Sequence, residues 1–222
     1  MKTITKLLAG AAVALSMSAA SAQAAVFIGL STDGGATITQ VFSGGDATFE
    51  YLTTNLGGFD TISVEGDPSI LPALLHSDVV NVNASGAASV SIFVTRTGIS
   101  APTYGGFFSS FSSNNSNNRF TVVTSTYVDD DDDVFGLDTL LASSTFSASG
   151  SQSSNFISPG AVPDGVFSVT NRYDISTTGG GTTSPTIILG AVPEPGTWAL
   201  MIMGFGGAGA MIRSRRRQMA AA

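Results

Sequence analysis

The chain has 222 residues, a formal net charge of −7 at neutral pH, an apolar content of 43% and no cysteine. The absence of cysteine excludes disulfide bonds, thiol catalysis and thiolate metal sites. A surface with excess negative charge repels nucleic acid and anionic lipid surfaces, so we expect neither as a partner.

Residues 1–24 have the three parts of a secretory signal peptide. Lys2 and Lys6 supply positive charge, residues 7–17 form an apolar run, and Ala22 and Ala24 are the small residues of a leader-peptidase site. An uncleaved anchor helix is the alternative, but the apolar run is short for a membrane span. The sequence therefore predicts a signal helix, export through the Sec machinery and cleavage by leader peptidase after Ala24.

Residues 25–191 are predicted to be one exported domain. This region has 15 acidic and three basic residues, which gives it a net charge of −12. Short runs of β-branched and aromatic residues alternate with turn-forming residues about every ten positions, which is typical of an antiparallel β-sandwich. We therefore expect an all-β domain of jelly-roll or Ig-like type.

The expected strands follow each other at short intervals. In chain order they are 36–42, 47–52, 61–64, 79–82, 88–97, 120–128, 145–149, 166–175 and 186–189. Gly44-Gly45-Asp46 is a turn signal at hairpin spacing between the first two strands. Two segments, 69–76 and 135–142, have weak helical periodicity, and each is expected to form a turn or two of helix.

Three phenylalanines occur in the sequence GGFFSSFSS. In a strand, Phe107 and Phe111 would share one face and Phe108 would lie on the other. Core packing is the simpler interpretation, and an exposed edge that stacks on sugars is the alternative.

The most conspicuous acidic feature is a run of five aspartates, Asp129, Asp130, Asp131, Asp132 and Asp133. Adjacent carboxylates offer oxygen ligands to Ca²⁺, and a bound cation would relieve their mutual repulsion. Calcium loops normally place ligands at alternate positions around a glycine, whereas Gly136 comes only after this run. A solvated acidic loop after a strand is the alternative, and calcium is the one cofactor that the sequence suggests.

No residue pattern typical of catalysis is present. His76 is the only histidine, so neither a polyhistidine metal site nor a recognisable triad is available. Glu50, Asp60, Glu65 and Asp138 are candidates for a pair of hydrolase carboxylates, but their spacing selects no pair. We therefore expect no catalytic residues and no enzymatic activity.

The C-terminal segment has a second apolar run. Trp198 to Ile212 has 15 residues without a charge, about 22 Å of helix against a hydrocarbon core of about 30 Å. The sequence predicts a transmembrane helix over about 196–212, and the four arginines that follow it would stay in the cytoplasm. These arginines are Arg213, Arg215, Arg216 and Arg217. A buried core helix would not end in such a cluster, and an ordinary anchor would not need the preceding Pro-Glu-Pro.

The segment 192–218 resembles a PEP-CTERM sorting signal of the PEPxxWA variant. The resemblance is carried by the helix, by the arginine cluster and by the motif residues Pro193, Glu194, Pro195, Trp198 and Ala199. It implies recognition by an exosortase, a membrane-embedded transpeptidase-like enzyme of bacteria that have an outer membrane. It also implies processing near the motif, where the prolines are expected to hold the chain extended and unpaired.

The expected function is that of a non-enzymatic surface or matrix protein associated with exopolysaccharide and biofilm. The protein would pass through an inner-membrane-anchored intermediate and then reach the cell surface or extracellular matrix of a Gram-negative bacterium. Two alternatives stay open, namely a calcium- or carbohydrate-binding module delivered by the same route, or a secreted hydrolase.

Overall fold

The computed structural model describes residues 24–45, 47–68, 73–100, 104–160, 162–193 and 195–220. The predicted signal helix lies outside these residues, except Ala24, and so do Ala22 and Glu194. The described residues form strands and one helix. They are β1 (Ala25–Ser31), β2 (Thr39–Gly45), β3 (Phe49–Leu56), β4 (Phe59–Asp67), β5 (Ala73–Ala84), β6 (Ala88–Ser100), β7 (Tyr104–Asn115), β8 (Phe120–Asp129), β9 (Thr139–Phe146), β10 (Gly150–Pro159), β11 (Val166–Thr177), β12 (Gly181–Pro193) and α1 (Pro195–Ala220).

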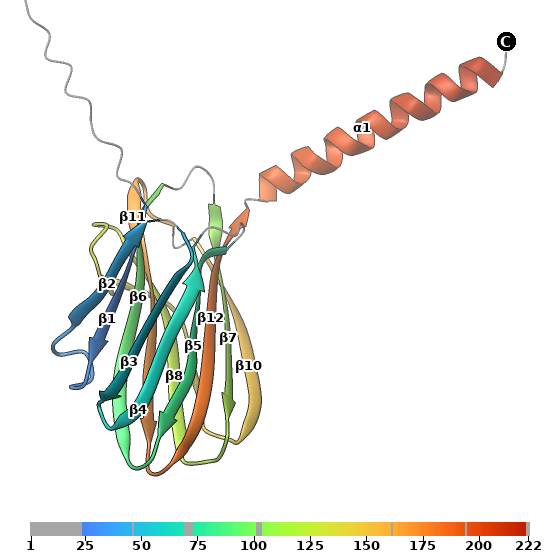
Figure 1. Ribbon diagram of the computed structural model, residues 1–222. Coiled ribbons are helices and arrows are strands. Elements are labelled where there is room, and N and C mark those ends of the chain that lie inside the picture. Colours follow the sequence, from blue (N-terminus) through green and yellow to red (C-terminus); the bar gives the residue numbers. More distant parts are fainter. Residues whose placement is uncertain are drawn as a thin grey trace, which may run out of the picture.

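The strands form two antiparallel six-stranded sheets that face each other (Figure 1). We name them sheet A, with the order β2-β1-β6-β11-β8-β9, and sheet B, with the order β10-β7-β12-β5-β4-β3. The predicted all-β antiparallel sandwich is therefore confirmed.

The pairing of the last eight strands is nested. β8 pairs with β9, β7 with β10, β6 with β11, and β5 with β12. Because alternate pairs lie in opposite sheets, this long folded hairpin is rolled into two layers, which is a jelly-roll arrangement rather than an Ig-like one. The hairpin β1–β2 extends sheet A beside β6, and β3–β4 extends sheet B beside β5.

Side chains that alternate along the strands fill the space between the sheets. Phe107 and Phe111 are fully buried, whereas Phe108 lies on the opposite face of β7 and is half-buried. The Phe107 ring in sheet B meets the Phe167 ring in sheet A edge to face, with 6.1 Å between the ring centroids. The predicted alternation is confirmed, and Phe107 and Phe111 pack in the core rather than at an exposed edge.

Three local predictions are wrong. The first two expected strands do not form a hairpin, because β2 pairs with β1 in sheet A and β3 pairs with β4 in sheet B. The described part of 69–76 is not helical but the start of β5, and 135–142 is a loop followed by the start of β9. Short apolar runs do not contain enough residues for their period to separate helix from strand.

The helix α1 projects away from the sandwich (Figure 1). It exposes large apolar side chains, among them Leu200, Ile202 and Phe205. Within the described part of the chain, no helix is long and apolar enough to cross a membrane. The transmembrane helix predicted over about 196–212 is therefore not confirmed.

Candidate binding site

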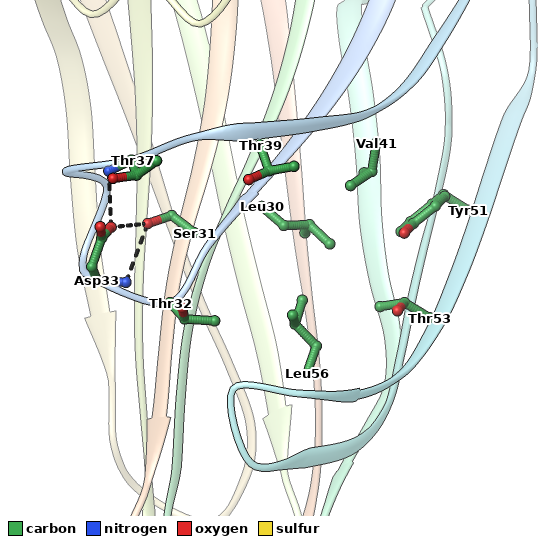
Figure 2. Close-up of a pocket in the computed structure, with 10 residues that line it drawn as sticks. All are labelled: Leu30, Ser31, Thr32, Asp33, Thr37, Thr39, Val41, Tyr51, Thr53 and Leu56. Atoms are coloured by element: carbon green, nitrogen blue, oxygen red, sulfur yellow. Dashed lines mark hydrogen bonds between the residues drawn. The ribbon is translucent and has the colours of Figure 1, made fainter.

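A pocket opens between the edges of the two sheets, where β2 is the last strand of sheet A and β3 the last strand of sheet B (Figure 2). Its volume is about 260 Å³. The lining residues come from β1, β2, β3 and the β1–β2 loop, and are Leu30, Ser31, Thr32, Asp33, Thr37, Thr39, Val41, Tyr51, Thr53 and Leu56.

The pocket has an apolar floor and hydroxyl-rich walls. Leu30 is buried, and Val41 and Leu56 pack against the core, so these side chains close the inner end. Tyr51 and Thr53 face the pocket from alternate positions of β3 (Figure 2). The intervening residue, Leu52, is on the other face of the strand and is 60% exposed.

Asp33 is held in place by the loop between β1 and β2. The Ser31 hydroxyl donates a hydrogen bond to Asp33 Oδ1 at 2.6 Å, and the Thr37 backbone N–H donates to the same oxygen at 2.9 Å. These bonds, that from Ser31 first, lower the pKa of Asp33 to about 2. Asp33 is therefore a fixed, ionised hydrogen-bond acceptor at neutral pH.

Glycine makes this loop possible. Gly34 and Gly35 both have positive φ angles, 77° and 98°, which side chains with a Cβ adopt only under strain. The Gly35 N–H donates to the Ser31 hydroxyl at 2.8 Å, so Ser31 is both a donor and an acceptor in the turn.

A second feature is an acidic groove of about 490 Å³ at β3, β4 and β5 in sheet B. Glu50 of β3 lies opposite Glu65 of β4, which in turn lies opposite Asp78 of β5. Each faces a like charge, which is unfavourable for pairing. The groove is lined by Thr48, Phe49, Glu50, Glu65, Gly66, Asp67, His76 and Asp78. We call this the acidic groove.

His76 provides an imidazole within this groove. Its Nε2 atom lies 3.2 Å from Asp78 Oδ2, and the hydrogen bond with Asp78 is the main reason that the pKa of His76 is raised. Burial alone would raise the pKa of Asp78, but hydrogen bonds with His76 and Thr186 together lower it. His76 is therefore half of an ion pair on a strand, not the end of a helical turn.

The structure brings together only two of the four candidate hydrolase carboxylates. Glu50 and Glu65 share the acidic groove. Asp60 instead accepts a hydrogen bond from the Ser85 hydroxyl at 3.1 Å. Asp138 lies near the aspartate run, where the negative charge of Asp129 raises its pKa.

The aspartate run is tied to the backbone around it. Asp129 is only 3% exposed, and its Oδ1 accepts hydrogen bonds from the N–H groups of Asp131 at 3.2 Å and Asp133 at 3.0 Å. Asp132 Oδ1 accepts a hydrogen bond from the Gly98 N–H at 2.7 Å. Asp129 and Asp132 thus cap backbone donors, as polar side chains commonly do in turns.

Calcium binding by this run stays a prediction. Among the residues that the structure describes, no three acidic or histidine side chains are placed to hold a metal ion. Asp130, Asp131 and Asp133 are exposed, as the alternative of a solvated loop expects.

The segment that resembles a sorting signal follows the sandwich directly. Pro193 is the last residue of β12 and pairs with Tyr104 of β7, and Pro195 is the first residue of α1. Proline is well suited to the first position of a helix, which does not need its missing N–H. The expectation that both prolines hold unpaired, extended chain is therefore wrong. Trp198, Ala199 and the arginines Arg213, Arg215, Arg216 and Arg217 all belong to α1, in which Ala199 and Arg213 are exposed.

Sequence reasoning missed the pocket between β2 and β3. It opens between β2 and β3, which correspond to two segments expected to pair with each other, whereas they stand in opposite sheets. The available signal was Ser31-Thr32-Asp33-Gly34-Gly35, a run of turn-forming residues after an apolar segment.

Comparison with known proteins gives one sequence match and several distant structural ones. The model of the PEP-CTERM protein-sorting motif matches residues 191–217. No curated protein matches the chain.

The structural likenesses are weak. TmCBM61 in complex with β-1,4-galactotriose shares 10% identity over 65% of this chain and 88% of that one, with a TM-score of 0.36. A family 11 carbohydrate-binding module from Clostridium thermocellum, in complex with a β-1,3-1,4-mixed-linked tetrasaccharide, is 11% identical in sequence. The match covers 76% of this chain and 98% of that one, with a TM-score of 0.30. The enzymatically active domain of tailspike protein 4 from bacteriophage CBA120 is 12% identical in sequence. The match covers 75% of this chain and 19% of that one, with a TM-score of 0.32.

Likenesses of this size do not identify what the chain binds. The C-terminal match is of a different kind, because it covers the segment in which the proline pair, the apolar helix and the arginines follow in order. Residues 191–217 of this chain are a PEP-CTERM protein-sorting motif.

Proposed function

We propose that this chain is an exported, non-catalytic protein of the cell surface or extracellular matrix of a Gram-negative bacterium, sorted and processed by an exosortase. The observation that carries the proposal is the position of the sorting motif, which begins as β12 ends.

The junction allows processing without damage to the domain. β12 lies between β7 and β5 inside sheet B, so its loss would divide the sheet. A cut between Glu194 and Ala199 would remove most of α1 and no strand. The sandwich would therefore leave the membrane folded, with its hydrogen-bonded strands intact.

The exposed apolar side chains of α1 support the proposal of a membrane-held intermediate. Exposed apolar side chains such as Leu200, Ile202 and Phe205 are unfavourable in water and gain free energy in lipid or against the processing enzyme. Arg213 and the arginines after it would remain on the cytoplasmic side. The exported domain would then face the outside until processing.

The other end of the domain is compatible with removal of a signal peptide. β1 begins at Ala25, directly after the predicted cleavage site at Ala24. Cleavage there by leader peptidase would leave every residue of the first strand in place.

The acidic groove favours no hydrolase. The general acid of a hydrolase is commonly a carboxyl group in a buried, largely apolar site. Glu50 and Glu65 are both exposed, so they lack these surroundings. We therefore propose a structural or binding role for the exported domain, within an extracellular polymer such as exopolysaccharide.

Replacement of Pro193, Glu194 and Pro195 by alanine tests the sorting route in the native host. We expect the variant to remain in the inner-membrane fraction, whereas the wild-type protein reaches the surface or the medium, because the processing enzyme loses its recognition sequence. Cell fractionation with immunoblotting measures the two distributions.

Pro185→Ala is the matched control, because it removes a proline from the same strand, outside the motif. This variant should be sorted like the wild type. If the triple variant also reaches the surface normally, the motif is not the sorting signal.

A further inference from the structure

We propose that the pocket between β2 and β3 binds one neutral sugar ring, as the terminal or exposed unit of an oligosaccharide or polysaccharide. The inference deepens the proposed function, on which its biological setting rests, because it names a ligand class and its site.

The pocket lies at the edge of the sandwich formed by β2 and β3, and the edge formed by β9 and β10 is built differently. On the opposite side, edge strands β9 and β10 are joined across the sheets by the Ser154 hydroxyl, which donates to Ser144 Oγ at 2.7 Å, and by the Ser158 hydroxyl, which donates to the Leu141 carbonyl at 2.6 Å. On the β2–β3 side, the Phe42 and Phe49 rings meet with 6.2 Å between their centroids. Val41 on β2 and Tyr51 on β3, which are close in sequence to these two phenylalanines, line the pocket on this side.

The lining matches the two kinds of surface on a sugar ring. A pyranose has an apolar face of C–H groups and a rim of hydroxyl groups. Leu30, Val41 and Leu56 provide an apolar floor, and the ring of Tyr51 provides an aromatic wall. Hydroxyl groups on both sides can donate to or accept from the rim, as polar groups in ligand pockets do. They belong to Thr39 on β2, Thr53 on β3 and the loop between β1 and β2 (Figure 2).

Charge selects a neutral sugar over an acidic one. Asp33 is ionised, and none of the pocket-lining residues is basic. A sulfate or carboxylate on the ligand would be repelled by Asp33. A neutral sugar hydroxyl, in contrast, can donate a charge-assisted hydrogen bond to the carboxylate.

Size limits the ligand to about one ring. The volume of about 260 Å³ is just below the range of about 300–1,000 Å³ that is typical of pockets for drug-sized ligands. The opening between two edge strands leaves the remaining units of a chain outside. The pocket therefore suits single-unit recognition rather than an extended groove.

A matched pair of substitutions on β3 tests whether a ligand binds in the pocket or on the surface around it. Thr53 lines the pocket, whereas Thr54 is the next residue and is exposed on the opposite face. Thr53→Val removes a hydroxyl from the pocket with little change of shape, and Thr54→Val removes the same group outside it. Tyr51→Phe removes the phenol hydroxyl but keeps the ring packed against the core.

The binding assay uses the full chain in a detergent without a sugar headgroup, since such headgroups would compete. An array of neutral and acidic oligosaccharides identifies the best neutral probe, and calorimetry with this probe and its terminal monosaccharide gives the affinities. We expect Thr53→Val and Tyr51→Phe each to weaken binding about 2- to 10-fold, the range for one hydrogen bond. Thr54→Val should bind like the wild type, and binding should persist in a chelator.

Several results would overturn the inference. The first is that the chain binds no neutral oligosaccharide, and the second is that it prefers acidic sugars. The third is that binding is lost in the chelator. The fourth is that the pocket variants bind like the wild type while their thermal unfolding is also unchanged. The outcome is independent of the sorting test. A chain without sugar binding can still be processed at its motif, and a chain that is not processed can still bind sugar in the calorimeter.

Discussion

His76 and Asp78 show how single side chains offset the charge of the acidic groove. The groove brings the carboxyl groups of Glu50, Glu65 and Asp67 close to this pair, and His76 is the only basic residue in its lining. The hydrogen bond with Asp78, and the negative charges of Asp78 and Asp67, favour the protonated form of His76 and raise its pKa. Proton binding to His76 and folding are therefore coupled.

The sign of the coupling follows from the raised pKa of His76. The folded state holds this proton more tightly than the unfolded chain, in which the pKa is about 6.5. The stabilisation is present in full below that pH and is lost as the pH rises through the folded-state pKa. We expect the free energy of unfolding to decrease over this window in the wild type, and to decrease less in His76→Gln, as measured by denaturant titrations at several pH values.

NMR titration of the single imidazole gives the control. Asp78→Asn should move the pKa of His76 down, whereas Asp60→Asn, which lies outside the groove, should leave it in place. Equal values in Asp78→Asn and the wild type would contradict the assignment of the ion pair.

At the residue scale, the sequence identified charges but not their partners. The run Asp129–Asp133 was an obvious feature, yet Asp132 acts on the N–H of Gly98, far from it in sequence. Asp33 carries no comparable signal in the sequence, because an aspartate beside glycines is usual in turns. Which residues a carboxylate meets depends on the pairing of distant strands, and local sequence does not contain that information.

The hairpin between β3 and β4 shows how an element depends on glycine. Leu56 pairs with Phe59, so Gly57 and Gly58 form a two-residue turn with φ angles of 61° and 88°. Positive φ at both central positions is the mark of a type I′ turn. The Gly57 carbonyl also accepts a hydrogen bond from the Ser89 N–H at 3.0 Å, which ties this turn to β6 in the other sheet.

Gly57→Ala tests the packing of this turn. A Cβ at this position would clash with the Ser89 carbonyl oxygen, and that clash adds to the strain of a positive φ. We expect a loss of about 1–3 kcal/mol from the backbone strain, with a further loss from the clash. Chemical denaturation gives the free energies of unfolding.

Gly150→Ala is the matched control, because Gly150 has a φ of 88° and no atom within 4 Å of an added Cβ. It carries the backbone strain without the clash and should be the milder change. Equal losses in the two variants would show that the turn does not pack against Ser89 as described.

At the element scale, most strands could be predicted from alternation and turn residues, but their connections could not. The chain passes from β2, which ends at Gly45, to β3, which begins at Phe49, but β2 belongs to sheet A and β3 to sheet B. A turn signal shows that the chain changes direction and does not show which sheet it enters. The pocket exists because of this crossover, so it could not be seen before the two sheets were known.

The whole molecule combines a β-sandwich with a C-terminal segment that carries the sorting motif. The sandwich is built from strands that pair across large separations in the sequence, and the C-terminal segment is a local motif in continuous order. This difference explains why the sequence alone predicts the sorting motif but not the pocket between β2 and β3.

The intact mass of the protein recovered from the surface or medium of its native host tests the central claim most directly. We predict a chain that begins at Ala25 and ends near the Pro193-Glu194-Pro195 motif, without the cluster from Arg213 to Arg217. In a host without the processing enzyme, the mass should include the arginines. A surface-exposed protein that keeps the arginine cluster in both hosts would contradict the account.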